Sequence, residues 1–176
     1  MKNKIAVGIL LLCFIGISNL FSQTNLAKEQ SKFIYIFTRE IEWPLDCNKG
    51  DFNIQVYGSN QLFNELKTYM NDKTVTGRHI NVKQTPNLEG VGHCHVLIIG
   101  QDKISEIQAI KRKVCNNKTL IITDKSEGIR DGACISFVLL GNRLNYEISP
   151  DNIVKMGLKY SADLVDLAVD SPLANH

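Results

Sequence analysis

The stretch that decides the fold is HVLIIGQDKISEIQAIKRKVCNNKTLIITD, residues 95–124. It has two short apolar runs, residues 95–100 and 119–124, on either side of a segment with helical spacing. The second run is rich in β-branched residues, which favour strands, and Asp102 is placed to cap the intervening helix. A strand, a helix and a strand in this order predict a parallel pair joined by a right-handed crossover.

The same alternation continues towards the N-terminus. FNIQVYG (52–58) and HINVK (79–83) have the composition of strands, and the segment between them predicts a helix capped by Ser59 or Asn60. We therefore expect one α/β domain with three layers. Its largely parallel sheet should be covered by helices on both faces and should end in an antiparallel C-terminal hairpin.

That hairpin is predicted by ACISFVLLGNRLNYEIS, residues 133–149, in which residues 141–142 (Gly-Asn) suit a II′ turn. Pairing outward from the turn places apolar residues opposite one another on a single face. We expect the opposite face, with Asn145 and Glu147, to be turned to solvent or to a partner. The predicted apolar pairs are Leu139–Leu144, Phe137–Tyr146 and Ile135–Ile148.

A helix is predicted at each end of this core. The first covers residues 25–41 and stops before Pro44, because the residue before a proline is pushed out of the helical region. We expect Trp43 to close one end of the core, with stacking on a ligand as its alternative role. The second starts after the cap Ser149. The apolar positions of the first helix are Leu26, Phe33, Phe37 and Ile41, and those of the second are Ile153, Met156, Tyr160, Leu164 and Leu167.

Residues 1–22 have the pattern of a signal peptide: a basic start, an apolar core and a small, polar exit. Cleavage near Ser22 would leave residues 23–176 as a single domain outside the cytoplasm. The alternative is an uncleaved membrane anchor, although the apolar run is short for spanning a bilayer.

The net charge of +2 comes entirely from the signal segment, which contains Lys2 and Lys4 and no acidic residue. Of the 20 basic residues, 18 remain after these two lysines are removed, and they balance the 18 acidic residues of the mature chain. Its charges are scattered, whereas nucleic-acid binding depends on clustered Lys and Arg. We therefore expect no nucleic-acid partner.

Four cysteines remain after cleavage, and in an oxidising compartment two disulfides are expected among Cys47, Cys94, Cys115 and Cys134. Cys47–Cys94 is the preferred pair, because both precede strands that are neighbours in a flavodoxin-like order. Cys115–Cys134 follows by elimination, and Cys94–Cys115 is the main rival. Because the link after Asp124 is short for a crossover, the next strand could instead run antiparallel. Cys134 would then lie at the opposite edge of the sheet from the other cysteines. A metal site at GHCH, residues 92–95, is an alternative to the disulfides. It is less favoured, because the sequence has no second pair of ligands at the spacing of zinc sites.

No motif for catalysis, for a cofactor or for a metal is found. The glycines of residues 90–95 precede a strand instead of following one, so they fail the dinucleotide-binding context. Open α/β sheets bind ligands beyond the carboxyl ends of their strands. The ligand-binding candidates on that basis are Ser59, Asn60, Gln101, Asp124 and Lys125, with turn capping as the alternative role of Asp124.

The segment KFIYIFTREIEWP, residues 32–44, resembles the xxFLYNFxxFVEWP start of the YfiR-like family of periplasmic regulatory proteins. The resemblance covers residues 28–168 in family order and departs from the usual pattern at Ile36 and at residues 132–133. It continues through FNIQVYG, KTVTGRHINVK, CHVLIIG, TLIITDKSEGIRDGACISFVLLGNRLNYEIS and GLKYSADLVDLA.

This resemblance implies an exported, non-enzymatic protein that binds and represses a membrane-bound signalling protein, typically a diguanylate cyclase. Some relatives instead serve as sensor modules of histidine kinases, and a homodimer is compatible with either role. The candidates for partner binding are Lys32, Tyr35 and Arg39, on the outer face of the N-terminal helix. The alternatives are a periplasmic small-ligand binder that uses the strand-end loops and, least favoured, an exported enzyme.

Overall fold

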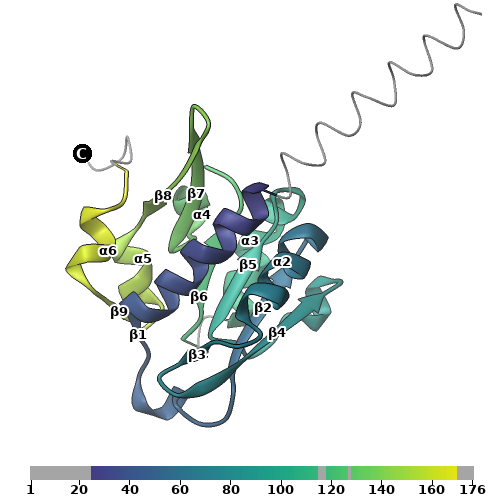
Figure 1. Ribbon diagram of the computed structural model, residues 1–176, viewed down its shortest axis with the longest axis vertical. Coiled ribbons are helices and arrows are strands. Elements are labelled where there is room, and N and C mark those ends of the chain that lie inside the picture. The colour runs from purple at the N-terminus through teal and green to yellow at the C-terminus, as the bar shows by residue number, and fades with distance from the viewer. Residues whose placement is uncertain (1–24, 115–117, 127, 170–176) are drawn as a thin grey trace, which may run out of the picture.

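The computed structural model describes residues 25–114, 118–126 and 128–169. Its centre is a seven-stranded sheet with the order β3-β4-β2-β5-β6-β7-β8 (Figure 1). Neighbours from β4 to β7 are parallel, whereas β3 and β8 are antiparallel to the strands beside them. The strands are β2 (Phe52–Tyr57), β3 (Thr74–Val75), β4 (Arg78–Thr85), β5 (Val96–Ile99), β6 (Leu120–Thr123), β7 (Ile135–Leu140) and β8 (Arg143–Ile148).

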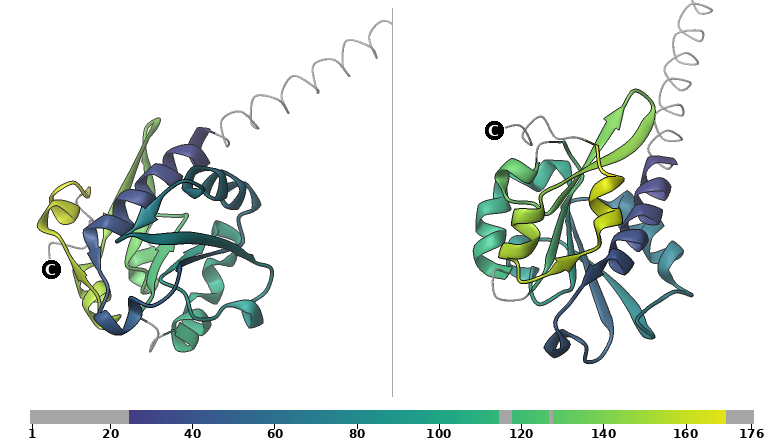
Figure 2. Two further views of the ribbon diagram at one scale, coloured as in Figure 1. Left: turned by 60° about the horizontal axis from the view of Figure 1, so that its bottom comes forward. Right: turned by 90° about the vertical axis from the view of Figure 1, so that its left-hand side faces the viewer.

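Helices cover both faces of this sheet, which confirms the predicted three-layer α/β fold (Figures 1 and 2). The N-terminal helix (25–40) and α2 (Asn60–Met70) lie on one face. On the other face lie α3 (Ile107–Val114), α4 (Gly128–Asp131) and α5 (Pro150–Lys155). No helix in the described part of the chain is long and apolar enough to cross a membrane.

The predicted cap at Asp102 is wrong. Asp102 lies inside the 3-10 helix η3 (Gln101–Glu106), which starts after Gly100 and leads into α3. The chain makes this tighter turn first, so the regular helix begins only at Ile107, where its buried face of Ile107, Ile110 and Val114 starts.

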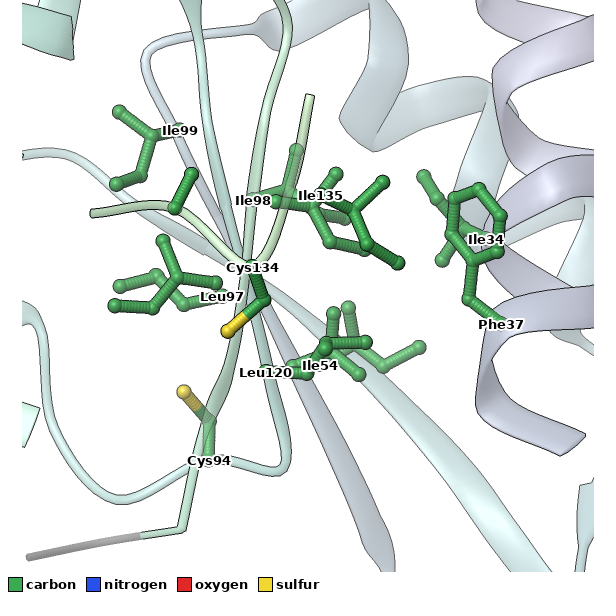
Figure 3. Packing of buried hydrophobic residues seen from close by; sticks show 14 of the residues in the cluster. Ile34, Phe37, Ile54, Cys94, Leu97, Ile98, Ile99, Leu120, Cys134 and Ile135 are labelled. Carbon is green, nitrogen blue, oxygen red and sulfur yellow. The ribbon is translucent and has the colours of Figure 1, made fainter. Parts of the chain in front are cut away.

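The core consists largely of isoleucine, valine and leucine side chains on the two faces of the sheet, together with aromatic residues such as Phe37 (Figure 3). Ile34 and Phe37 of the N-terminal helix are fully buried on the same side as Ile54 and Leu120. The buried face of this helix is therefore shifted from the predicted one. Ile34 lies at the centre of the buried face, whereas Phe33 is only partly buried. Gln30 and Ser31 share the buried face.

The hairpin has the predicted register, with Phe137 opposite Tyr146 and Leu139 opposite Leu144. Gly141 has a φ of 61°, as the first central position of a II′ turn requires. Glu147, however, is buried, so the expectation that its whole face meets solvent is wrong. The base of the hairpin continues the central sheet, and both of its faces are covered there. Only the tip is open, where Leu139 is 56% and Leu140 55% exposed.

The N-terminal helix leads into β1 (Ile41–Glu42), which pairs antiparallel with β9 (Lys159–Tyr160) in a separate two-stranded sheet. Trp43 follows at once, and its indole is buried against the edge of the Phe52 ring, with the centroids 5.0 Å apart. Its Nε1 donates to the carbonyl of Lys118 at 3.0 Å. Trp43 therefore closes one end of the core as predicted, and Pro44 starts the short 3-10 helix η1 (Leu45–Cys47).

The single C-terminal helix predicted after Ser149 is wrong. The chain forms α5, then β9, then α6 (Ala162–Asp166). Gly157 has a φ of 72°, a left-handed conformation that ends the helical path and lets the chain turn into β9. Leu167 is consequently 73% exposed instead of buried. A further 3-10 helix, η2 (Leu88–Gly90), lies between β4 and β5.

The structure contains Cys47, Cys94 and Cys134 as free thiols, so the preferred Cys47–Cys94 bridge is not formed; Cys115 lies outside the described residues. The two strands that follow Cys47 and Cys94 are indeed neighbours. Cys47, however, lies at the partly exposed end of η1, whereas Cys94 is fully buried among core side chains (Figure 3). The link after Asp124 passes through α4 and returns parallel, which excludes the antiparallel alternative for Cys134.

Candidate functional site

A cavity of about 810 Å³ opens at the carboxyl ends of the central strands. Loops after β2, β5 and β6 supply its polar wall, and the N-terminal helix and the hairpin supply its apolar wall. The polar wall includes Ser59, Gln101, Asp124 and Lys125, and the apolar wall includes Leu26 and Leu144.

This opening lies where the strand order changes direction. After β2 the chain turns to α2 on one face of the sheet, and after β5 it turns to η3 and α3 on the other. The two loops touch there, since a Cβ atom on Gly100 would lie 2.5 Å from the carbonyl oxygen of Gly58. Such a switch point is where doubly wound sheets form ligand-binding crevices.

Asp124 is the polar centre of the cavity. Its Oδ1 accepts a hydrogen bond from Nε2 of Gln30, which reaches it from the buried face of the N-terminal helix. Burial raises the pKa of Asp124 to about 6, because the charged carboxylate is poorly solvated, and the Gln30 hydrogen bond offsets only part of this. Lys125 and Glu147 are the other ionisable residues among the described lining.

Four of the five ligand-binding candidates from the sequence line this cavity, namely Ser59, Gln101, Asp124 and Lys125. Asn60 does not: it starts α2, and its Oδ1 accepts a hydrogen bond from Gln84 on β4. The Ser59 hydroxyl caps α2 by accepting from the Leu62 amide at 3.4 Å. These placements follow from the parallel strands, whose carboxyl ends all meet at one edge.

Sequence reasoning missed Gln30 and the hairpin tip as parts of this site. Gln30 is polar within an otherwise apolar helix face, and that anomaly was the available signal. Leu139 and Leu140 form an exposed rim beside the cavity. The mixed lining suits a small molecule with an apolar body and a hydrogen-bonding head, or an apolar side chain of a partner.

The three partner-binding candidates on the N-terminal helix differ in their surroundings. Lys32 is paired with Glu29 at 2.7 Å. Tyr35 is partly buried, and its hydroxyl donates to the carbonyl of Thr74 at 3.4 Å. Arg39 is exposed and makes no ion pair or side-chain hydrogen bond with any residue that the structure describes. Arg39 is thus the candidate best placed to meet a partner.

His95 of the GHCH segment is held by hydrogen bonds and ring stacking within the fold. The Nδ1 atom of His95 accepts from the Asn53 amide at 3.0 Å, so its proton is on Nε2, which donates to the carbonyl of Cys47 at 2.9 Å. Its ring stacks on Phe52 with a centroid distance of 4.5 Å. Within the described ranges, no group of three or more His, Cys, Asp and Glu side chains is arranged to hold a metal ion.

A sequence profile of the YfiR/HmsC-like family matches residues 27–169, which is nearly all of the described chain. The chain belongs to the YfiR/HmsC-like family. This confirms the family resemblance of the segment that ends in Trp43-Pro44. The YfiR/HmsC-like family is regulatory rather than catalytic, periplasmic, and generally partnered with a membrane signalling protein. No curated protein matches the chain.

Proposed function

We propose that this protein is exported by its N-terminal segment and binds the outward-facing part of a membrane-bound diguanylate cyclase, whose activity it represses. The observation that carries this proposal is membership of the YfiR/HmsC-like family over residues 27–169. The apolar run within residues 1–22, which lies outside the described residues, supports export. A histidine kinase is the alternative membrane partner.

The contact surface that we propose is the outer face of the N-terminal helix, with Lys32, Tyr35 and Arg39. Arg39 supports this choice because it is exposed and unpaired among the described residues. Ile36 lies on the same stretch and is 46% exposed, so the face offers an apolar contact beside the charge. Arginine with a neighbouring apolar group is a common combination in protein interfaces.

Sensing of a small ligand is a second candidate function, and it is favoured by the cavity beside Asp124. A ligand there would contact both the N-terminal helix and the hairpin. Because the same helix carries the proposed contact surface, occupancy of the cavity would alter the fit to the partner. Ligand sensing would therefore act through the regulation of the partner, and it does not require an enzymatic step.

The test is to co-express the chain with a membrane-bound diguanylate cyclase from the same genome, in cells without other cyclases, and to measure cyclic di-GMP. We expect its level to fall with the full chain. It should not fall with residues 23–176 alone, which would stay in the cytoplasm. Repression by this leaderless form, or no repression by either form, would contradict the proposal for that cyclase.

The contact surface is tested separately by the charge reversal Arg39→Glu. We expect binding of the cyclase to weaken by about tenfold, since one exposed interface arginine contributes roughly 1–2 kcal/mol. The melting temperature should stay unchanged. The control is Arg143→Glu, at an exposed arginine on the hairpin. Unchanged binding with Arg39→Glu would remove this helix face from consideration.

A further inference from the structure

A second cavity, of about 350 Å³, lies between the end of the N-terminal helix and the turn that joins β3 to β4. Among the described residues it shares no lining with the cavity beside Asp124. The helix end and β1 contribute one wall, and the β3–β4 turn and Asn48, which follows η1, contribute the other. The lining that matters for charge and hydrogen bonding is Arg39, Glu42, Asn48, Thr74, Thr76 and Arg78.

The charge of this cavity is positive. Two guanidinium groups line it, those of Arg39 and Arg78. The one acidic residue in the described lining is Glu42, and its carboxylate is paired with Lys159 at 3.4 Å. Arg39 has no charged or hydrogen-bonding partner within the part of the chain that the structure describes. The two arginines are therefore not neutralised by the surrounding protein.

Arg78 is held in place entirely by neutral groups. Its Nη1 donates to the carbonyl of Cys47 at 2.8 Å, its Nε donates to the Thr76 hydroxyl at 3.4 Å, and the guanidinium lies 5.2 Å from the centroid of the Phe52 ring. The His95 Nε2 atom lies 3.2 Å from Nη1, but it does not accept a hydrogen bond from Arg78, because its proton is donated to the same carbonyl. Burial lowers the pKa of Arg78, since its charge has lost solvent without gaining a carboxylate.

The β3–β4 turn adds two threonine side chains and an unusual backbone conformation to the rim. Thr76 has a φ of 51°, which a β-branched residue rarely adopts. Its hydroxyl donates to the carbonyl of Val75 at 2.7 Å, and the turn places Thr74 and Thr76 beside Arg78. Strained backbone of this kind persists where the surrounding structure holds it and is common at binding sites.

We propose that this second cavity binds a small organic oxyanion, with its carboxylate or phosphate group held between Arg39 and Arg78. Arginine presents a planar fork of donors that matches both groups and pairs with them in bidentate fashion. Ile41, Trp43 and Val75 form the apolar part of the lining, so the group that carries the anion is small and at least partly apolar. A cavity of this size lies at the small end of ligand sites.

The test is calorimetric titration of the exported protein with succinate and, separately, with inorganic phosphate, at constant ionic strength set with chloride. We expect at least one oxyanion to bind, and Arg39→Gln to weaken its binding by about tenfold or more. Arg39→Lys, which keeps the charge but loses the fork, should give an intermediate loss. Arg143→Gln on the hairpin is the matched control and should bind as the wild type does.

The two probes distinguish the chemistry of the anion. Binding of succinate alone assigns a carboxylate, binding of phosphate alone assigns a phosphate, and binding of both supports a general oxyanion site. The proposal is overturned if neither probe binds at concentrations up to about 10 mM, or if Arg39→Gln binds as tightly as the wild type. Arg78 is not the primary test, because its bond to the carbonyl of Cys47 also supports the fold.

Discussion

At the scale of single residues, the informative positions are polar groups that the fold has placed in apolar surroundings. Gln30 lies on a buried helix face and bonds to Asp124, and His95 lies under Phe52 and holds the carbonyl of Cys47. Gln30 is a neutral partner for the Asp124 carboxyl group, and the Cys47 carbonyl is a neutral partner for His95. Because burial disfavours its charged form, Asp124 has a raised pKa. Its protonation state therefore links the pH to the cavity that it lines.

The raised pKa of Asp124 predicts a pH-dependent contribution to stability. The folded state binds this proton more tightly than the unfolded state, so the contribution is complete below about pH 4 and is lost as the pH rises through about 6. After allowance for partial exposure, about 2 kcal/mol should disappear between pH 4 and 7. Urea unfolding at several pH values checks this, since Asp124→Asn should lack the decline and the exposed control Asp166→Asn should keep it. Parallel profiles for wild type and Asp124→Asn would contradict it.

At the scale of elements, the N-terminal helix has fully buried and exposed side chains within a single turn. Ile34 is fully buried against the sheet, whereas Ile36, two residues later, is 46% exposed. The same helix supplies Gln30 to one cavity and Arg39 to the other. Its inner face therefore stabilises the fold, while its outer face is available for binding.

The two isoleucines form a matched pair for testing this division. Ile34→Ala should lower the free energy of unfolding by about 3 kcal/mol, because it leaves a cavity in the core. Ile36→Ala should change it by less than about 0.5 kcal/mol. Equilibrium unfolding in urea measures both values. Equal losses would mean that the helix does not present these faces as described.

The loops at the switch point give a second prediction at this scale. Gly100→Ala places a Cβ atom 2.5 Å from the carbonyl oxygen of Gly58, so the two loops must move apart. We expect a loss of about 2 kcal/mol or more in the free energy of unfolding. Gly92→Ala is the control, because the nearest atom to its added Cβ is 4.0 Å away. Thermal melting of both variants decides the matter, and a stable Gly100→Ala protein would show that the contact is loose.

At the scale of the whole molecule, two thiols report on global opening. Cys94 and Cys134 are fully buried, and burial raises the pKa of each to about 12, because the thiolate would be poorly solvated. Cys47 is only partly buried. Reactivity towards an alkylating reagent should therefore follow exposure.

We expect iodoacetamide to label Cys47 in the folded protein and to label Cys94 and Cys134 about a thousandfold more slowly, at the rate set by opening of the core. A Cys115→Ser background keeps the remaining mature thiol out of the assay. Urea should bring all three to similar rates. If Cys47 and Cys94 both resist labelling until reductant is added, the bridge expected from the sequence exists after all and the free thiols are wrong.

The sequence by itself determined the features that depend on neighbours along the chain. The strand–helix–strand period, the II′ turn at Gly141 and the hairpin register each act over a short separation, and all three are found in the structure. The pairing of β1 with β9 has no such signal, since each strand has two residues and they lie far apart in the chain. The relative placement of Cys47 and Cys94 likewise depends on distant segments, whereas the helix break at Gly157 is a local glycine signal that the apolar periodicity of the segment outweighed in the prediction. Only the tertiary structure decided the two cavities, because a cavity is defined by side chains that packing brings together from distant segments.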